Sequence, residues 1–124
     1  MQITITDELK RTKCGVYIIN FDNGMFYIGS SKILNQRVYN QTREILNNFS
    51  RPSCCIALRA MKGFDGECKI SLLREVKIDK VRMFGALPEI LRNEAEFILS
   101  NKDNEKCLNW NKTLYKRNIP INFK

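Results

Sequence analysis

The strongest constraint on the fold is a pair of short apolar runs separated by a turn signal. The runs Val16–Phe21 and Met25–Ile28 are rich in β-branched and aromatic residues, and Asp22-Asn23-Gly24 lies between them. This arrangement predicts a β-hairpin. The loop length then decides which side chains share a face, because a shift of one residue moves every side chain to the opposite face of the sheet.

The loop also decides whether Tyr17 and Tyr27 lie together. A two-residue Asn-Gly turn would place the two rings on opposite faces of the sheet. A three-residue loop, with Gly24 in the left-handed conformation, would place them on one face in a diagonal relation. A site shared by the two tyrosines requires the second arrangement, or a longer loop of the same parity.

The chain as a whole predicts one α+β domain over residues 1–124, with a core at about 13–111 and a basic C-terminal arm at 112–124. This length is enough to bury one core. Periodicity and turn residues predict its other elements. They are a strand or arm at 2–6, a helical turn or loop at 7–13, helices at about 33–47, 54–61 and 88–100, a strand at 68–76 and a short ordered segment at 107–110.

Helix 33–47 carries polar groups on and beside its apolar stripe. Gln41 interrupts the stripe, and Arg37 lies beside it on the side expected to face the sheet. A guanidinium in this place could bind a phosphate through two parallel hydrogen bonds. The alternative is the commoner one, a surface arginine on a helix of a basic protein. A serine of the Ser30-Ser31 pair is expected to cap this helix. The apolar stripe consists of Leu34, Val38 and Ile45.

Glu94 occupies a position that is usually apolar. In the predicted helix 88–100 it recurs at helical spacing with Leu87, Leu91 and Ile98. A carboxylate buried at such a position is destabilising unless a cation or a metal ion compensates its charge. The alternative is a partly exposed glutamate paired with a neighbouring lysine.

Charge and residue types narrow the function. A net charge of +8 favours a polyanionic partner, and nucleic acid is the simplest one. The chain has no histidine, which excludes Cys/His zinc sites and removes the commonest general base. Its five cysteines form no CxxC pair, and neither a signal peptide nor a membrane-spanning run is evident. We therefore expect reduced thiols and a cytoplasmic protein without a membrane partner.

The segment Gly15–Arg37 resembles the signature of the GIY-YIG nuclease superfamily. Its matching motifs are Gly15-Val16-Tyr17, Tyr27-Ile28-Gly29-Ser30-Ser31 and Arg37, in order and in spacing. Downstream, Glu94-Ala95-Glu96-Phe97-Ile98 resembles the segment in which a glutamate precedes an aromatic–isoleucine pair, and Asn109 matches the asparagine that often closes the domain. The resemblance implies a small antiparallel sheet of three strands flanked by helices.

The resemblance also implies an activity, the metal-dependent hydrolysis of DNA phosphodiester bonds to a 5′-phosphate and a 3′-hydroxyl. Glu94 would hold Mg²⁺ (or Mn²⁺), which stabilises the leaving oxygen, and Arg37 would neutralise charge on the non-bridging oxygens. Tyr17 would orient or deprotonate the attacking water, and Tyr27 would position it. Gly29 and Ser31 would have supporting roles.

Two positions depart from the family pattern. Family members usually carry His or Tyr four residues after the arginine, and this chain has Gln41. The role of that group is then lost, moved to Tyr39, or unnecessary. Where some homing members carry a histidine, this chain reads roughly Arg51-Pro52. Arg51 could contact phosphate but could not shuttle protons.

Several basic side chains are candidates for contacts with the DNA backbone. They are Lys32, Arg43, Arg51, Lys112, Lys116 and Arg117. Duplex cleavage would need a homodimer, sequential nicking or rebinding. The length suits a restriction-like, repair-like or phage-type nuclease of a bacterial or phage-infected cell. The alternatives are a catalytically weak or inactive nucleic-acid-binding module with the same fold and an RNA-directed nuclease.

Overall fold

The computed structural model describes residues 2–49, 57–77 and 86–109 of the chain. In chain order the elements are β1 (Gln2–Ile5), α1 (Asp7–Arg11), β2 (Gly15–Phe21), β3 (Phe26–Ser31), α2 (Leu34–Leu46), the 3₁₀ helix η1 (Ala57–Met61), β4 (Glu67–Glu75) and α3 (Ala86–Ser100). The predicted α+β class is confirmed. The helix predicted at 54–61 is a 3₁₀ helix over its described part, and the predicted arm at 112–124 lies outside the described residues.

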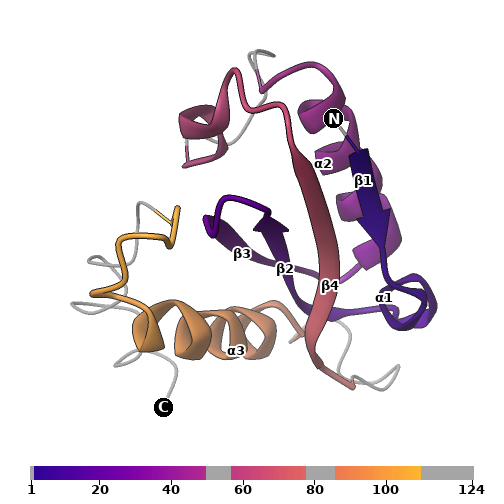
Figure 1. Ribbon diagram of the computed structural model, residues 1–124. Coiled ribbons are helices and arrows are strands. Elements are labelled where there is room, and N and C mark those ends of the chain that lie inside the picture. The colour runs from indigo at the N-terminus through magenta and orange to yellow at the C-terminus, as the bar shows by residue number, and fades with distance from the viewer. Residues whose placement is uncertain (1, 50–56, 78–85, 110–124) are drawn as a thin grey trace.

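The sheet is mixed and has four strands in the order β1-β4-β2-β3 (Figure 1). Strand β2 pairs antiparallel with both β3 and β4, as expected. The prediction of three antiparallel strands was nevertheless wrong, because β1 joins the sheet as a fourth strand, parallel to β4. Gln2 lies opposite Glu67 in this pairing. Alternation at the N-terminus indicated a strand or an arm, but it carries no information about so distant a partner.

The hairpin loop is the three-residue loop Asp22–Gly24. The Phe21 N–H donates to the Met25 carbonyl at 2.9 Å, and Gly24 has a φ of 91°, which favours glycine. This confirms the three-residue alternative. Across the hairpin, Tyr17 lies opposite Gly29 and Tyr27 lies opposite Ile19. Since alternate residues of a strand share a face, the two tyrosines lie on the same face of the sheet.

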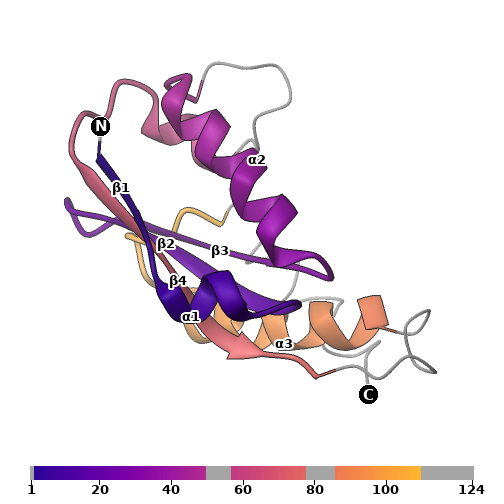
Figure 2. The same ribbon diagram turned by 90° about the vertical axis from the view of Figure 1, so that its right-hand side faces the viewer.

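Helices α2 and α3 cover opposite faces of the sheet (Figures 1 and 2). The face toward α2 holds the larger apolar cluster, in which β2 residues such as Ile19 and Phe21 pack with residues of α2 such as Leu34 and Ile45. The opposite face holds a smaller cluster toward α3. It consists of Val16, Ile28, Ala95 and Ile98. Among the described residues, no helix combines the length and the apolar character that crossing a membrane requires.

Candidate active site

A cavity of about 780 Å³ lies between α2, the hairpin and α3, and it includes Gly29–Ser31 of the edge strand β3. Because β3 is an edge strand, side chains from the layers on both faces of the sheet reach this cavity. Tyr17, Tyr27, Arg37 and Glu94, the four predicted catalytic residues, all line it. The structure therefore brings together four groups that are spread over 78 residues of sequence.

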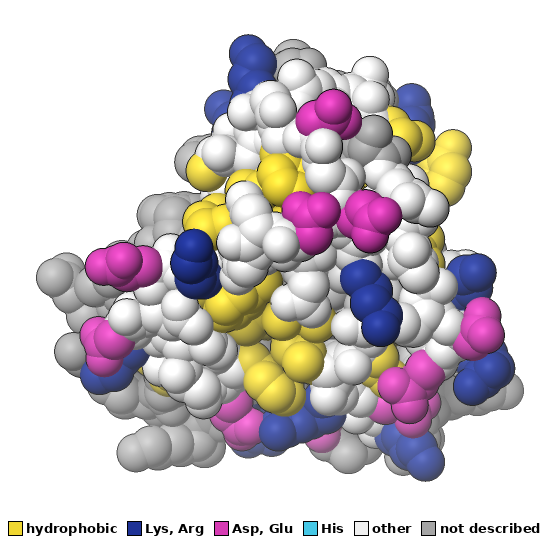
Figure 3. Space-filling view, in the orientation of Figure 1, with side chains coloured by type: hydrophobic (Ala, Val, Ile, Leu, Met, Phe, Trp, Pro, Cys, Tyr) yellow, Lys and Arg dark blue, Asp and Glu magenta, His cyan; other side chains and the backbone are white. Residues whose placement is uncertain are grey.

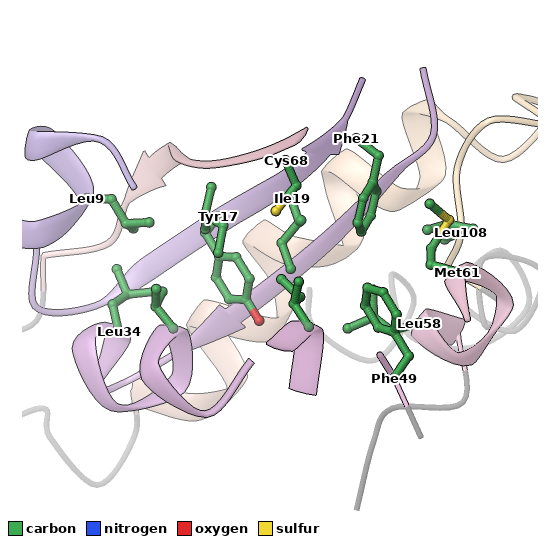
Figure 4. Packing of buried hydrophobic residues seen from close by; sticks show 13 residues of the cluster. Leu9, Tyr17, Ile19, Phe21, Leu34, Phe49, Leu58, Met61, Cys68 and Leu108 are labelled. Atoms are coloured by element: carbon green, nitrogen blue, oxygen red, sulfur yellow. The ribbon is translucent and has the colours of Figure 1, made fainter. Parts of the chain in front are cut away.

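Tyr17 is held from two sides. It is only 1 % exposed, and its hydroxyl donates a hydrogen bond to the Gln41 Oε1 atom of α2, a side chain that is itself 3 % exposed. Figure 4 shows the ring packed among apolar side chains with the hydroxyl directed toward α2. On the other side, a Cβ at Gly29 would overlap the phenol, so the absence of a side chain at Gly29 makes room for the ring.

Gln41, and not Tyr39, occupies the position beside the Tyr17 hydroxyl. Tyr39 is 61 % exposed, carries the Arg43 guanidinium 5.8 Å above its ring and does not line the cavity. Of the two candidates for the role of the family group, only Gln41 lies on the cavity wall. The polar interruption of the apolar stripe was the signal for Gln41, but no spacing in the sequence identifies Tyr17 as its partner.

Glu94 reaches the cavity from α3. The Ser30 hydroxyl donates to its Oε1 atom at 3.0 Å, and the side chain is half-buried. Among the side chains described for this helix, Ile90, Ala95 and Ile98 are buried, so the helix is rotated relative to the predicted stripe. Glu94 lies beside the buried stripe and not within it. This rotation places the Glu94 side chain on the cavity wall.

Arg37 is exposed on α2 and lines the cavity one turn after the helix begins. The predicted serine cap takes a different form, since the N-cap residue is Ile33 and it makes no side-chain capping bond. Instead, the Ser31 hydroxyl oxygen accepts the Ile33 N–H at 3.0 Å and shapes the turn before the helix. Ser31 and Lys32 both line the cavity from this turn.

The sequence reasoning missed three polar residues that α2 contributes to the cavity wall. Gln36, Asn40 and Glu44 line it from α2. They follow one another at intervals of four residues on the helix face that also carries Arg37, and helical spacing from that arginine could have found them. Arg43 also lines the cavity, so three cations face two carboxylates, Glu44 and Glu94, around it.

Asn109 has a structural part in the site and does not line the cavity. Its Oδ1 atom accepts the Ile28 N–H at 2.9 Å, and its Nδ2 atom donates to the Ile28 carbonyl at 2.8 Å. Phe26 is paired in the same way by backbone groups of Lys106 and Leu108. The segment from Lys106 to Asn109 thus supplies hydrogen-bond partners to the backbone groups on the outer edge of β3 as far as Ile28.

A divalent ion fits the residues on the cavity wall. Mg²⁺ keeps several water ligands and is often held by one or two carboxylates together with substrate phosphates. Within the part of the chain that the structure describes, no three His, Cys, Asp or Glu side chains form a metal-ligating group. The half-buried Glu94 carboxylate, oriented by Ser30 at an open cavity, matches the sparse ligation that Mg²⁺ accepts.

Most of the net positive charge comes from residues outside the described ones. Seven of the 21 Lys and Arg residues fall there, against one of the 13 Asp and Glu residues, so six of the eight net charges do. In the view of Figure 3, basic and acidic side chains alternate around apolar ones over the described surface. Four candidate DNA contacts lie outside the described residues. They are Arg51, Lys112, Lys116 and Arg117.

Comparisons of the chain with protein-family models, with curated proteins and with solved structures give no match.

Proposed function

We propose that this protein is a Mg²⁺-dependent endonuclease of the GIY-YIG type that hydrolyses DNA phosphodiester bonds. The observation that carries the proposal is the presence of Tyr17, Tyr27, Arg37 and Glu94 on the wall of one cavity. All four residues thus surround one space in which a phosphodiester could bind. The motif resemblance, the basic composition and the polar lining of the cavity support the same activity.

Each of the four groups has a role that its chemistry allows. Arg37 binds a non-bridging phosphate oxygen and neutralises the charge that builds there in the transition state. Glu94, oriented by the Ser30 hydroxyl, would hold the divalent ion, which would supply charge stabilisation at the leaving oxygen. The tyrosine hydroxyls place the attacking water opposite the leaving group, and the products are a 5′-phosphate and a 3′-hydroxyl.

A single active site in this cavity cuts one DNA strand at a time. A protomer that acts alone therefore converts supercoiled plasmid to nicked circles before any linear DNA forms. Linear DNA as the first product would indicate a dimer with two cavities. Lys32 and Arg43, at the cavity wall, bind the phosphates that flank the scissile bond.

The test is a plasmid-nicking assay with and without Mg²⁺, followed by end-group analysis of the products. We expect Mg²⁺-dependent nicking that leaves 5′-phosphate ends and that Glu94→Ala abolishes. A matched RNA substrate distinguishes a DNA-directed from an RNA-directed enzyme. If wild type binds DNA but never nicks it with Mg²⁺ or Mn²⁺, the protein is a nucleic-acid-binding module and the proposal fails.

A further inference from the structure

The contact between Tyr17 and Gln41 is a buried polar pair inside an otherwise apolar layer. Both side chains belong to the α2 side of the sheet, both are almost fully buried, and both residues line the cavity. Of the two, the phenol donates, and the amide oxygen Oε1 accepts. A buried polar group that keeps a hydrogen-bond partner avoids the desolvation penalty of an unsatisfied one, so the protein can bury both side chains without that cost.

The direction of this hydrogen bond fixes what Tyr17 can offer to a ligand. Its one proton is committed to Gln41, so its hydroxyl can present only an oxygen lone pair to the cavity. A lone pair orients a water molecule by accepting a hydrogen bond from it. Gln41 is an amide and cannot relay a proton, unlike the His or Tyr that the motif leads one to expect there.

We propose that Gln41 is a positioning residue that keeps the Tyr17 hydroxyl protonated and turned inward, so that Tyr17 orients the attacking water without removing its proton. This rests on the proposed nuclease function. It chooses between the two roles open to Tyr17, orientation and deprotonation. No proton transfer to Tyr17 is part of the role; the proton that the attacking water loses passes to solvent water in the cavity.

The charged and titratable groups around Tyr17 come from each packed element. Lys32, in the turn before α2, and Arg37 and Glu44 of α2 face the same cavity, with Tyr27 from β3 and Glu94 from α3. The Tyr17 hydroxyl donates its hydrogen bond to Gln41, which lines the same cavity. The inference rests on this hydrogen bond.

The test uses three substitutions in the full chain. Gln41→Leu removes the acceptor, Gln41→Glu keeps an acceptor oxygen at the same length but has no N–H to donate, and Tyr17→Phe removes the donor. Thermal melting first establishes that each variant is folded at the assay temperature. The readouts are kcat and KM for plasmid nicking and, independently of activity, the slowly exchanging Tyr17 hydroxyl proton in the NMR spectrum.

We expect Gln41→Leu to lower kcat by about 10²-fold with little change in KM, because the water is misplaced while DNA binding is intact. The same substitution made on top of Tyr17→Phe has no further effect, since Gln41 acts through the hydroxyl. Gln41→Glu retains most of the wild-type rate at mildly alkaline pH. The hydroxyl proton signal is present in wild type and Gln41→Glu, and absent in Gln41→Leu.

Three results overturn the inference. If Gln41→Glu loses activity as fully as Gln41→Leu, Gln41 donates to an ionised Tyr17 and does not accept from a neutral one. If Gln41→Leu and Tyr17→Phe lower kcat additively, or Gln41→Leu leaves kcat unchanged, Gln41 does not act through Tyr17. A wild type that does not nick overturns the proposed function and with it this role, even if the NMR signal shows that the hydrogen bond exists.

Discussion

The two faces of the β2–β3 hairpin are built from alternate residues of the same strands, yet they differ in the side chains that pack on them. Toward α3, the side chains of Val16 and Ile28 meet Ala95 and Ile98 in a small apolar cluster. Toward α2, Tyr17 and Gln41 place a hydrogen bond inside the layer. This second face also borders the cavity of about 780 Å³.

The difference separates apolar contacts, which serve stability, from the polar groups of the cavity wall, which serve chemistry. Apolar contacts that exclude water contribute to folding and offer nothing to a phosphate. A cavity with oriented polar groups is costly to maintain unless those groups are hydrogen-bonded, as Tyr17 is to Gln41 and Glu94 is to Ser30. Substitutions of the polar groups that line the cavity should therefore change catalysis without unfolding the protein. Substitutions in the apolar cluster toward α3 should do the reverse.

The largest effect is expected from Arg37→Ala, on the cavity side. Loss of the guanidinium removes charge stabilisation in the transition state, so nicking should slow by about 10²- to 10³-fold, or about 3 to 4 kcal/mol. Because Arg37 is exposed, the melting temperature should stay the same. Arg11→Ala, with the same loss of charge on the exposed side of α1, is the control and should nick normally. An equal loss of nicking in both variants would mean that Arg37 contributes only to the net charge of the protein and has no role at the site.

Next in size is Ile98→Ala, on the α3 side. Ile98 is fully buried against the hairpin, so its truncation should lower the free energy of unfolding by about 3 kcal/mol. Urea denaturation measures this loss, and nicking per folded molecule should remain unchanged at low temperature. Leu46→Ala, at a side chain that is 65 % exposed, is the control and should cost less than about 0.5 kcal/mol. If Ile98→Ala abolishes nicking while folded, the two faces are not separable.

Gly29→Ala should affect both stability and nicking, because Gly29 lines the cavity and lies against the Tyr17 ring. Its added Cβ would collide with the Tyr17 phenol, which we expect to cost about 2 kcal/mol of stability and to displace the hydroxyl. Nicking and urea denaturation measure the two effects. At Gly63, with a φ of +90°, a Cβ would meet open space. Gly63→Ala should therefore lower stability through backbone strain but leave nicking intact. Normal nicking by Gly29→Ala would show that Tyr17 needs no fixed position.

The smallest effect concerns Cys68, a buried group on the α2 side but outside the cavity. Burial, with the Asp22 carboxylate adding to it, raises the pKa of this thiol from 9.0 to about 11. The folded state then holds the proton more tightly than the unfolded state. The stabilising contribution is complete below pH 9 and is lost as the pH rises toward 11, by about 1 kcal/mol between pH 9 and pH 10. Urea denaturation of wild type against Cys68→Ala should show this slope only in wild type. Equal slopes would mean that Cys68 does not titrate as a buried thiol.

Local signals predicted the hairpin well. Asp22-Asn23-Gly24 contains a glycine at the position that needs a positive φ, and this set the parity that places Tyr17 and Tyr27 on one face. Pairings between strands that are distant in sequence could not be predicted from local signals. The alternation in Gln2–Ile5 could not identify β4 as its parallel partner, because no spacing rule connects two strands 65 residues apart.

The site followed the same division. The rotation of α3 was mispredicted, because the small side chain of Ala95 packs against the hairpin at a position that the expected stripe left out. Gln41 was noticed as an interruption, but its partner lies on another element, 24 residues earlier. The convergence of Arg37 and Glu94 was expected only from the motif resemblance, since it depends on how two helices on opposite faces reach around one edge strand.

Two glutamates of α3 allow the most direct test of the central claim. Glu94 faces the cavity, whereas Glu96 lies on the surface and pairs with Arg74 at 2.6 Å. Single-turnover plasmid nicking at saturating Mg²⁺ should fall to the rate without metal in Glu94→Gln and stay at the wild-type rate in Glu96→Gln, with both proteins folded. Equal nicking by the two variants would contradict the assignment of the cavity as the site of phosphodiester hydrolysis.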